Sequence, residues 1–343
     1  MELNGIRLEE IRELIEGLGE KSFRAEQIFR FWHQQNGKDV SDLKQIPSQL
    51  RQKLSLEHSV SGMKVYKRFR SQNDPTVKYL YLLDDGNIIE SVVMKYEHGY
   101  SLCISTQVGC RMGCSFCAST KEGLVRNLTT GELLNQLYLA EEDLGIRISN
   151  IVLMGSGEPL DNFCNVDRFF DIINHVKGRN ISLRNITLST CGVVPGIYKL
   201  AEKDIPITLS ISLHSPFDER RAQIMPIAKK YKLDELFNSL RTYSEKTGRR
   251  ITFEYTLIEN ENDRDEDALE MAKLMRGLLC HVNLIPLNPI KEFDKGRPEK
   301  KGVAAFQKKL LDYGIPTTIR REMGGDISAS CGQLRRSFID DKN

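Results

Sequence analysis

Three cysteines, Cys110, Cys114 and Cys117, lie within eight residues in the spacing C-x-x-x-C-x-x-C. Three thiolates on one tight segment can hold three irons of a 4Fe–4S cube, whereas an electron-transfer cluster takes four cysteines. The iron without a cysteine can then bind a further molecule, as a catalytic metal does at its open position. Two glycines, Gly109 and Gly113, allow the backbone to pass close to a bulky cofactor. On spacing alone, a zinc site short of one ligand and a set of buried structural cysteines remain alternatives.

A further cysteine, Cys331, lies near the end of the sequence among small residues, flanked by glycines at 324, 325 and 332. Because a thiol on such a loop is sterically open, it is better suited to reactivity than to packing. Cys103 lies seven residues before the triplet and within an expected strand. The remaining cysteines have no partner at metal-ligand spacing and are expected to be buried as small apolar residues: Cys164, Cys191 and Cys280.

The chain has 343 residues, of which 40% are hydrophobic and 28% are charged, and its net charge is +2. This length can bury a full core and indicates two domains, or one large domain with appendages. With so little net charge, a polyanion would have to be bound by local basic patches. No apolar run approaches the ~18 residues of a membrane-spanning helix, and no basic start precedes an early apolar run. We therefore expect a cytosolic protein, in which eight cysteines indicate metal or redox chemistry rather than disulfides.

The first 60 residues have apolar side chains at helical spacing and predict three helices, the third interrupted by Pro47. This segment has no excess of basic residues. On charge alone, a helical domain that serves only for packing is as compatible with it as a nucleic-acid-binding domain. Residues 64–78 carry five Lys or Arg against one Asp, with Tyr66 and Phe69 among them. That composition is a modest indication of nucleic-acid binding, and a solvated strand face is equally compatible with it.

The pattern changes to strands from residue 79. Two apolar runs at residues 79–83 and 88–94, joined by a D-D-G-N turn, predict a hairpin. Strands and amphipathic helices then alternate, which predicts a parallel sheet, either open and doubly wound or closed toward a barrel. Strands are expected at residues 101–105, 150–154, 185–188, 207–213, 251–257, 281–287 and 317–320. One helix begins at the capping box of Thr129 and Glu132, and others are expected at residues 166–176, 233–247, 265–279 and 303–313.

Polar and unusual residues follow the ends of these expected strands. The cysteine triplet follows the first strand, and a Gly-Ser-Gly-Glu-Pro segment at residues 155–159 follows the second. Ser189 comes at the end of the third strand, His214 at the end of the fourth, and Asn288 after the sixth. Because the carboxyl ends of parallel strands form the ligand-binding face of α/β folds, we expect these residues to gather on one rim.

Each polar segment has two interpretations. The carboxylate of Glu158 and the backbone N–H groups beside it could hold the amine of an amino-acid-like cofactor, but a tight turn into a helix also explains them. The segment is not G-x-G-x-x-G, so no dinucleotide site is indicated. Ser189 and the run from Ser212 to His214 fit either a ligand site or satisfied polar groups at strand ends. Asn288 could hydrogen-bond an adenosine, and a turn before Pro289 explains it equally well.

In combination, these motifs resemble those of the RlmN/Cfr family of radical S-adenosylmethionine RNA adenosine methyltransferases. The resemblance rests on the triplet, Gly157 and Glu158, Ser212 to His214, and the A-S-C-G-Q-L run at residues 329–334, and it extends from residues 11–32 to residues 320–336. It implies an α/β fold in which a partial (β/α)6 barrel carries the cluster, with a small helical N-terminal domain for RNA recognition and a β-hairpin extension. The implied domains are residues 1–72 (helical), 73–100 (hairpin) and 101–343 (radical S-adenosylmethionine core with the Cys331 loop).

The resemblance also implies a role for each matching residue. Cys110, Cys114 and Cys117 would bind a 4Fe–4S cluster. S-adenosylmethionine would contact Gly157, Glu158, Ser189, Ser212, Leu213, His214 and Asn288. Cys331 would carry the methyl group, Cys103 would be the resolving cysteine, and Glu90 would accept a proton. Two departures from the family pattern, Ser156 before the second glycine and Ser330 before Cys331, remove no functional group that the chemistry needs.

The implied chemistry accounts for these residue types. Carbon 2 of adenine is electron-poor and does not attack a methyl sulfonium, so a radical route is required. One S-adenosylmethionine would methylate Cys331, and a second would be cleaved reductively to a 5′-deoxyadenosyl radical that activates this methyl group for addition to the base. Proton loss to Glu90 and attack by Cys103 on the sulfur of Cys331 would release product and leave a disulfide, so both sulfurs must come within bonding reach.

The resemblance therefore predicts methylation of carbon 2 of an adenosine in the peptidyl-transferase centre of 23S rRNA, and in tRNA. It implies an electron donor such as flavodoxin or ferredoxin, a cytoplasmic monomer and no membrane partner, and we expect RNA contacts at residues 64–70 and 335–336. Methylation at carbon 8, as in the Cfr branch, is the nearest alternative, but the N-terminal segment and residues 321–324 are closer to the RlmN branch. Two alternatives from other classes are a radical activase or cofactor-biosynthesis enzyme, which would not need Cys103 or Cys331, and an iron–sulfur or zinc RNA-binding module.

Overall fold

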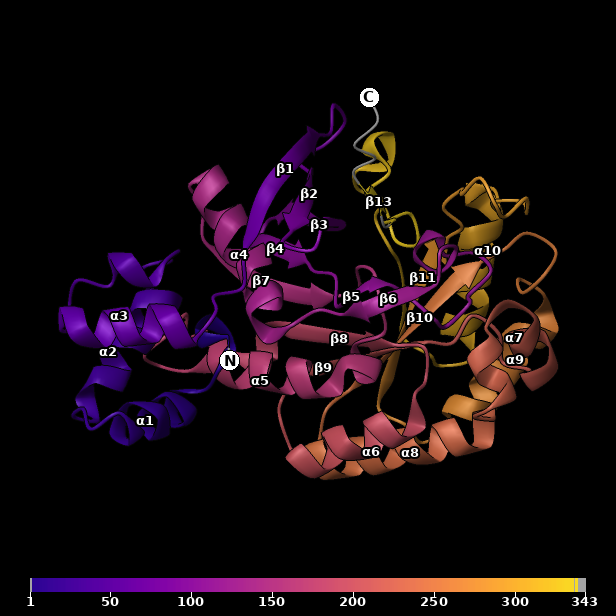
Figure 1. Ribbon diagram of the computed structural model, residues 1–343. Coiled ribbons are helices and arrows are strands. Elements are labelled where there is room, and N and C mark those ends of the chain that lie inside the picture. The colour runs from indigo at the N-terminus through magenta and orange to yellow at the C-terminus, as the bar shows by residue number, and fades with distance from the viewer. Residues whose placement is uncertain (1, 336, 339–343) are drawn as a thin grey trace.

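The computed structural model describes residues 2–335 and 337–338. Three N-terminal helices, α1 (Leu8–Gly17), α2 (Phe23–His33) and α3 (Ser48–Glu57), lie to one side of a large sheet (Figure 1). The strands are β1 (Met63–Arg70), β2 (Val77–Leu83), β3 (Asn87–Tyr96), β4 (Gly99–Cys103), β5 (Gln107–Gly109), β6 (Leu124–Asn127), β7 (Ile148–Leu153), β8 (Ile186–Thr190), β9 (Thr208–Ser212), β10 (Ile251–Leu257), β11 (Cys280–Pro286), β12 (Thr317–Ile319) and β13 (Ser337–Phe338). The remaining helices are α4 (Thr130–Leu144), α5 (Phe163–Asn174), α6 (Val194–Lys203), α7 (Asp218–Ile224), α8 (Leu233–Thr247), α9 (Asp265–Met275) and α10 (Lys300–Asp312).

The large sheet has the strand order β1-β2-β3-β4-β7-β8-β9-β10-β11-β12, with β13 paired to β3. Every pair from β4 to β12 is parallel, and these strands follow one another in the order of the sequence. Sequential parallel strands joined by crossovers of one hand place their helices on one face of the sheet. Helices α5, α6, α8 and α10 accordingly lie along the outside of the curved sheet (Figure 1). The predicted partial α/β barrel is confirmed, and the doubly wound alternative is wrong.

An antiparallel extension precedes the barrel. β2 and β3 form the predicted hairpin, and β3 pairs with β4, the first parallel strand. β1 adds a third antiparallel strand outside β2, so the basic residues at 64–70 lie on an edge strand of the sheet. Most of these residues are exposed on that strand, as expected where only one face has anything to pack against.

Most helices and strands lie within a few residues of the predicted positions, because their apolar periodicity is strong. The capping box of α4 is present: the Thr129 hydroxyl accepts a hydrogen bond from the Glu132 N–H (3.2 Å), and the Glu132 carboxylate accepts one from the Thr129 N–H (2.9 Å). Two helices were not predicted. α6 carries Pro195 and Gly196 in its first turn, which are typical of a loop, and α7 is a short, mostly charged segment without an apolar stripe.

The N-terminal helices are fixed to the core. Arg7 pairs with Asp167 (2.9 Å) and Asp171 (2.6 Å) of α5, and Arg168 of α5 pairs with Glu10 of α1 (2.6 Å). In addition, Nδ1 of buried His33 on α2 lies 2.8 Å from the hydroxyl of Tyr138 on α4. The apolar residues of these helices belong to the same buried cluster as those of the barrel. Within the described residues, no helix is long and apolar enough to cross a membrane.

Candidate active site

The three cysteines of the triplet line one large cavity at the carboxyl ends of the parallel strands, which we call the rim cavity. It has an empty volume of about 940 Å³, including space open to solvent, which is in the range of cofactor sites. The rim expected from the sequence is thus assembled around the triplet. The predicted residues that share this cavity with the cysteines are Gly157, Glu158, Ser189, Ser212, His214, Asn288 and Cys331.

The loop that carries the triplet runs from β5 into β6. Gly109 has φ +75°, and a Cβ at this position would lie 2.0 Å from the carbonyl oxygen of Gly123, so the return of the chain leaves no room for a side chain. On its other side the loop packs against the C-terminal end of α7: the Ser115 N–H donates to the Ile224 carbonyl (2.9 Å). The ring of Phe116 contacts His214 edge-on at 4.7 Å between centroids. The loop is therefore held between its own hairpin and the rim of the barrel.

The Gly-Ser-Gly-Glu-Pro segment forms a turn and also presents its carboxylate to the rim cavity. Gly157 has φ +107°, and a Cβ there would lie 2.6 Å from the Cβ of Gln107. The two carboxylate oxygens of buried Glu158 accept from the Leu160 N–H (3.0 Å) and the Cys191 N–H (2.8 Å). Burial raises the pKa of Glu158, and these backbone donors oppose the shift. Both interpretations of this segment are therefore compatible with its geometry.

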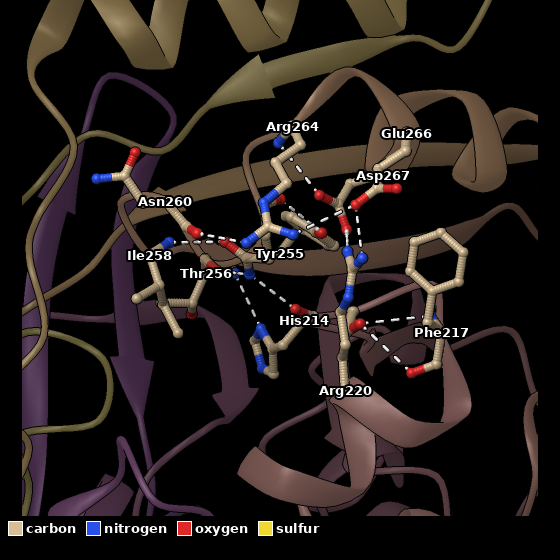
Figure 2. A network of polar contacts seen from close by, with 12 residues as sticks. His214, Phe217, Arg220, Tyr255, Thr256, Ile258, Asn260, Arg264, Glu266 and Asp267 are labelled. Carbon is tan, nitrogen blue, oxygen red and sulfur yellow. Dashed lines mark hydrogen bonds and ion pairs between the residues drawn. The ribbon is translucent and has the colours of Figure 1, made fainter.

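His214 is neutral and has a defined tautomer. Its Nδ1 accepts from the backbone N–H of Thr256 (2.9 Å), and burial lowers its pKa to about 3. The proton of the neutral ring is consequently on Nε2, which makes the ring a hydrogen-bond donor. Figure 2 shows His214 beneath Thr256, with the ion pairs of Arg220 to Glu266 and Asp267 to its right. Leu213, next to it, is fully buried and does not line the rim cavity.

The Cys331 loop is bonded to both sides of the rim cavity. The amide of Asn288 donates to the Cys331 carbonyl at 3.0 Å. The Ala118 N–H, one residue after the triplet, donates to the Gly332 carbonyl (2.7 Å), and the Ser119 hydroxyl donates to the Leu334 carbonyl (2.7 Å). Cys331 itself is partly exposed, as expected for an open thiol. These bonds bring the C-terminal loop directly onto the end of the cysteine triplet.

A smaller cavity, which we call the side cavity, lies next to the rim cavity and has an empty volume of about 610 Å³. Cys103 and Cys331 both line it, so the two cysteines of the predicted pair share one cavity. Cys103 is buried among apolar side chains that include Val92 and Leu334. Cys331 lines both cavities and is therefore part of the wall between them.

Glu90 lines neither cavity. It is buried, its carboxylate accepts from the Arg335 N–H (3.0 Å), and it lies 3.4 Å from the Lys78 ammonium. Burial raises its pKa, and Lys78 acts in the opposite direction. Glu90 and Val92 are two residues apart on β3 and so face the same side of the sheet, and Val92 lines the side cavity.

Several residues of the site carry no sequence motif and were not predicted. Arg221 is fully buried and donates to the carbonyls of Cys191 (2.6 Å), Ser212 (3.1 Å) and Leu213 (3.1 Å), which ties two strand ends together beneath the rim cavity. Met154, Glu254 and Arg320 also line the rim cavity. Arg320 directly follows β12, the last parallel strand, so its position at a strand end is the sequence signal that indicates it.

The three remaining cysteines differ from one another. Cys191 and Cys280 are buried, as predicted, and Cys191 lines the rim cavity. The prediction for Cys164 was wrong: it is exposed near the start of α5, because the apolar stripe of this helix points the other way, toward Val166 and Phe170.

Comparison with known proteins identifies the family. The Radical SAM superfamily model matches residues 104–272, and the model described as ribosomal RNA large subunit methyltransferase N-terminal domain matches residues 1–60. A protein named probable dual-specificity RNA methyltransferase RlmN, from Alkaliphilus oremlandii, is 53% identical and covers 99% of this chain and 98% of its own length. A relative of the same name from Clostridium acetobutylicum is 52% identical and covers 97% and 96%. The chain belongs to the RlmN family of radical S-adenosylmethionine RNA methyltransferases.

A solved structure agrees with this membership of the RlmN family. The crystal structure of a radical SAM methyltransferase from Sphaerobacter thermophilus is 40% identical to this chain and superposes with a TM-score of 0.92, covering 97% of this chain and 99% of that one. The match includes the N-terminal helices and the Cys331 loop as well as the barrel, because it spans almost the whole length.

As a radical S-adenosylmethionine enzyme, an RlmN-family protein uses a 4Fe–4S cluster and S-adenosylmethionine. The donor set of the rim cavity fits this pair: three thiols line it together with a carboxylate and a neutral imidazole. Among the described residues, no group of three or more His, Cys, Asp or Glu is placed to hold a single metal ion. A cube binds each cysteine through a different iron, so its three thiols need not converge on one point.

We predict that Cys114→Ala will prevent cluster binding. Cys114 is buried at the inner side of the rim cavity, and two thiols cannot hold the cube that three would. The measurement is iron and sulfide content with the visible spectrum after anaerobic reconstitution. Cys164→Ala is the matched control, because it removes an exposed thiol outside the cavity. A Cys114→Ala protein with full iron content and full activity would contradict the assignment of the triplet.

Proposed function

We propose that this enzyme methylates carbon 2 of an adenosine in the peptidyl-transferase centre of 23S rRNA, and of an adenosine in tRNA, through a methyl-cysteine on Cys331. The observation that carries the proposal is that Cys331 lines the wall between the rim cavity and the side cavity, where Cys103 lies. A methyl carrier must meet the cofactor on one side and the base on the other, and Cys331 is accessible from both. The relatives' names support two substrates, since they describe a dual-specificity RNA methyltransferase.

Each predicted residue then has a task. Cys110, Cys114 and Cys117 would hold the cluster, and Gly157, Glu158, Ser189, Ser212, Leu213, His214 and Asn288 would form the S-adenosylmethionine site. When bound, these cofactors supply a methyl group for a thiolate and, after reductive cleavage, a radical that takes hydrogen from a methyl group. Glu158 offers a carboxylate to an ammonium group, and His214 offers an Nε2 donor. Leu213 does not line the cavity, and its backbone N–H and carbonyl are bonded to Glu254 (3.1 Å) and Arg221 (3.1 Å), so it would support the site by holding its neighbours Ser212 and His214 in place.

Two residues would complete the reaction on the base. Cys103 would attack the sulfur of Cys331, forming a Cys103–Cys331 disulfide and breaking the bond between that sulfur and the methylene carbon. The released carbon would take up a proton to become the methyl group, and the unpaired electron left by radical addition would return to the electron donor. Glu90 would accept the proton from carbon 2, since a carboxylate whose pKa is raised by burial binds a proton readily. The Arg335 N–H occupies one of its oxygens, so we expect the Cys331 loop to shift when the base enters.

The deciding experiment is mass analysis of adenosines. RNA fragments of 23S rRNA and tRNA are incubated with the reduced, cluster-loaded enzyme and two molecules of S-adenosylmethionine per site, then digested to nucleosides. We expect 2-methyladenosine, identified against a standard. Finding 8-methyladenosine would assign the carbon-8 reaction of the Cfr branch instead. Cleavage of S-adenosylmethionine without any methylated nucleoside would indicate a radical activase.

The proposed reaction also requires an electron donor, a cellular compartment that contains its RNA substrates, and an oligomeric state. The reductive cleavage needs a one-electron donor such as flavodoxin or ferredoxin. An enzyme acting on 23S rRNA and tRNA would work in the cytoplasm. We propose that it acts as a monomer, since both cavities are built from one chain.

The edge strand β1 is the surface that we propose for RNA. Lys64, Lys67 and Arg70 are exposed along it, without an ion pair among the described residues, and Tyr66 is 52% exposed between them. Exposed cations on an edge strand, with an exposed aromatic side chain among them, suit a phosphate backbone and an unstacked base. The second predicted contact is weaker: Arg335 is paired with Glu292 (2.8 Å), and Arg336 lies outside the described residues.

RNA binding should depend on salt although the net charge is only +2. If three phosphates are contacted, raising the salt from about 50 to about 200 mM should weaken binding roughly 20- to 40-fold, because binding releases counterions from the RNA. Replacing Lys64, Lys67 and Arg70 with glutamine should remove most of this dependence, measured by fluorescence anisotropy. The control variant replaces the exposed Lys246, Lys300 and Lys301 on α8 and α10, far from β1 in Figure 1. Equal salt dependence in both variants would exclude β1 as the RNA surface.

A further inference from the structure

Arg320 lies in the wall between the two cavities, next to both reactive cysteines. It lines the rim cavity and the side cavity, as Cys331 does. Its backbone N–H donates to the Leu284 carbonyl (2.8 Å), which fixes it as a continuation of β12 beside β11. Its guanidinium lies 3.3 Å from the carboxylate of Glu254, and its side chain is only 22% exposed. None of the reaction steps proposed for Cys331, Cys103 and Glu90 uses this cation.

Met154 connects Arg320 to Cys103. The two terminal nitrogens of the Arg320 guanidinium lie 3.7 and 3.8 Å from the Met154 sulfur. The backbone N–H of the same Met154 hydrogen-bonds the Cys103 thiol. One residue thus separates the guanidinium from the thiol, and its side chain is polarisable rather than charged.

Cys103 lies in surroundings that oppose a thiolate. Burial raises its pKa to about 12, and the Cys331 sulfur acts in the same direction. The titratable and charged groups that face it or line the same cavity are Tyr96, Arg297, Arg320, Arg321, Glu322 and Cys331, with Glu254 behind Arg320 and Glu90 two residues from Val92 on the neighbouring strand. A nucleophilic cysteine must ionise, so a buried one needs a cation close by.

We propose that Arg320, held in place by Glu254, is the positioning residue that stabilises the thiolate of Cys103. The inference rests on the proposed function, in which Cys103 is the nucleophile. Arg320 keeps its charge at any pH of interest, because a guanidinium does not deprotonate in proteins. Glu254 is itself held by Asn283 (3.0 Å) and by Ser210 (3.4 Å), so the guanidinium cannot swing away from the wall. The proton released by Cys103 passes to solvent through the side cavity.

The test measures how fast Cys103 reacts as a function of pH. Cluster-loaded protein without RNA is treated anaerobically with iodoacetamide, and alkylation of Cys103 is quantified by peptide mass spectrometry relative to exposed Cys164. Arg320→Gln should shift the Cys103 profile to higher pH and slow alkylation about tenfold at a given pH, which corresponds to about one pKa unit. Arg320→Lys should restore most of the rate, because it restores the charge. Arg320→Met is a second neutral variant that suits the apolar contacts, should the glutamine variant not fold.

The adjacent arginine provides a matched control. Arg321 is exposed and lines the same cavity, so Arg321→Gln removes an equal charge one residue away. We expect its Cys103 profile to match that of the unmodified protein. A neutral Arg320 variant that folds, loads its cluster and keeps an unchanged Cys103 profile would overturn the proposal. So would a variant that only weakens RNA binding, because Arg320 would then be a ligand for RNA.

A second readout separates this inference from the proposed function. With RNA present, a neutral Arg320 variant should accumulate a covalent protein–RNA species, because Cys103 no longer releases the product quickly. Cys103→Ala is run in parallel. If Cys103→Ala accumulates this species and the Arg320 variants do not, the role of Arg320 is wrong and the proposed function stands. If Cys103→Ala accumulates none and turns over normally, the proposed function itself fails.

Discussion

Cys331→Ala should form no methylated RNA and no methylated protein, although it should still bind its cluster. The thiol that we propose as the methyl carrier is lost, while the three cysteines of the triplet and the rest of the rim cavity are unchanged. The two bonds from Ala118 and Ser119 reach the carbonyls of Gly332 and Leu334, so removing the Cys331 sulfur does not break them. The result expected is activity at background with full iron content.

Two measurements check this outcome. Intact-protein mass spectrometry reports methylation of the protein, and nucleoside analysis reports methylation of the RNA. Cys280→Ala is the control, because it removes a buried cysteine of β11 that lines neither cavity. If Cys331→Ala still methylates RNA, the methyl group cannot travel through this residue and the two-cysteine route must be abandoned.

Cys103→Ala should fail in a different way. Methylation of Cys331 and addition to the base would still proceed, but no thiol would remain in the side cavity to attack the Cys331 sulfur. The enzyme should therefore become covalently joined to RNA through Cys331, up to one RNA for each chain. Denaturing gel electrophoresis should show a slow band that nuclease shortens, and peptide mapping should locate the linkage at Cys331.

The control for this result is the double variant with Cys103→Ala and Cys331→Ala, which should give no slow band. The two single variants thus have opposite signatures: one forms no covalent species, and the other accumulates it. A radical activase would show neither, because it has no use for this pair of cysteines. Normal turnover by Cys103→Ala would rule out Cys103 as the resolving cysteine.

The sequence was most informative where local pattern determines structure. The strands from β7 to β11 were predicted because apolar residues dominate them. The triplet, Glu158, His214 and Asn288 follow the ends of parallel strands and, as predicted from those positions, line one cavity. The contact between Asn288 and the Cys331 carbonyl was not predictable, because it depends on how a loop 43 residues away folds back.

Buried charges were the main omission. Arg221 and Glu254 look like surface residues in a sequence, since most arginines and glutamates are exposed. They are buried here because carbonyls at strand ends or polar partners on neighbouring strands satisfy them. Whether a buried charge has such hydrogen-bond partners depends on which residues are close in three dimensions, so no spacing along the chain predicts it.

The attachment of the N-terminal helices to the core has a consequence for substrate choice. Ion pairs from Arg7 and Arg168 and the buried His33–Tyr138 contact fix these helices to α4 and α5, with one shared apolar core beneath them. If these helices hold part of the RNA, in addition to the contacts that we propose on β1, that part would lie at a fixed distance from the two cavities. Two RNAs of unrelated sequence would both qualify when they present an adenosine at that distance. Selection would then operate on the shape of the RNA, and dual specificity would need only one binding geometry.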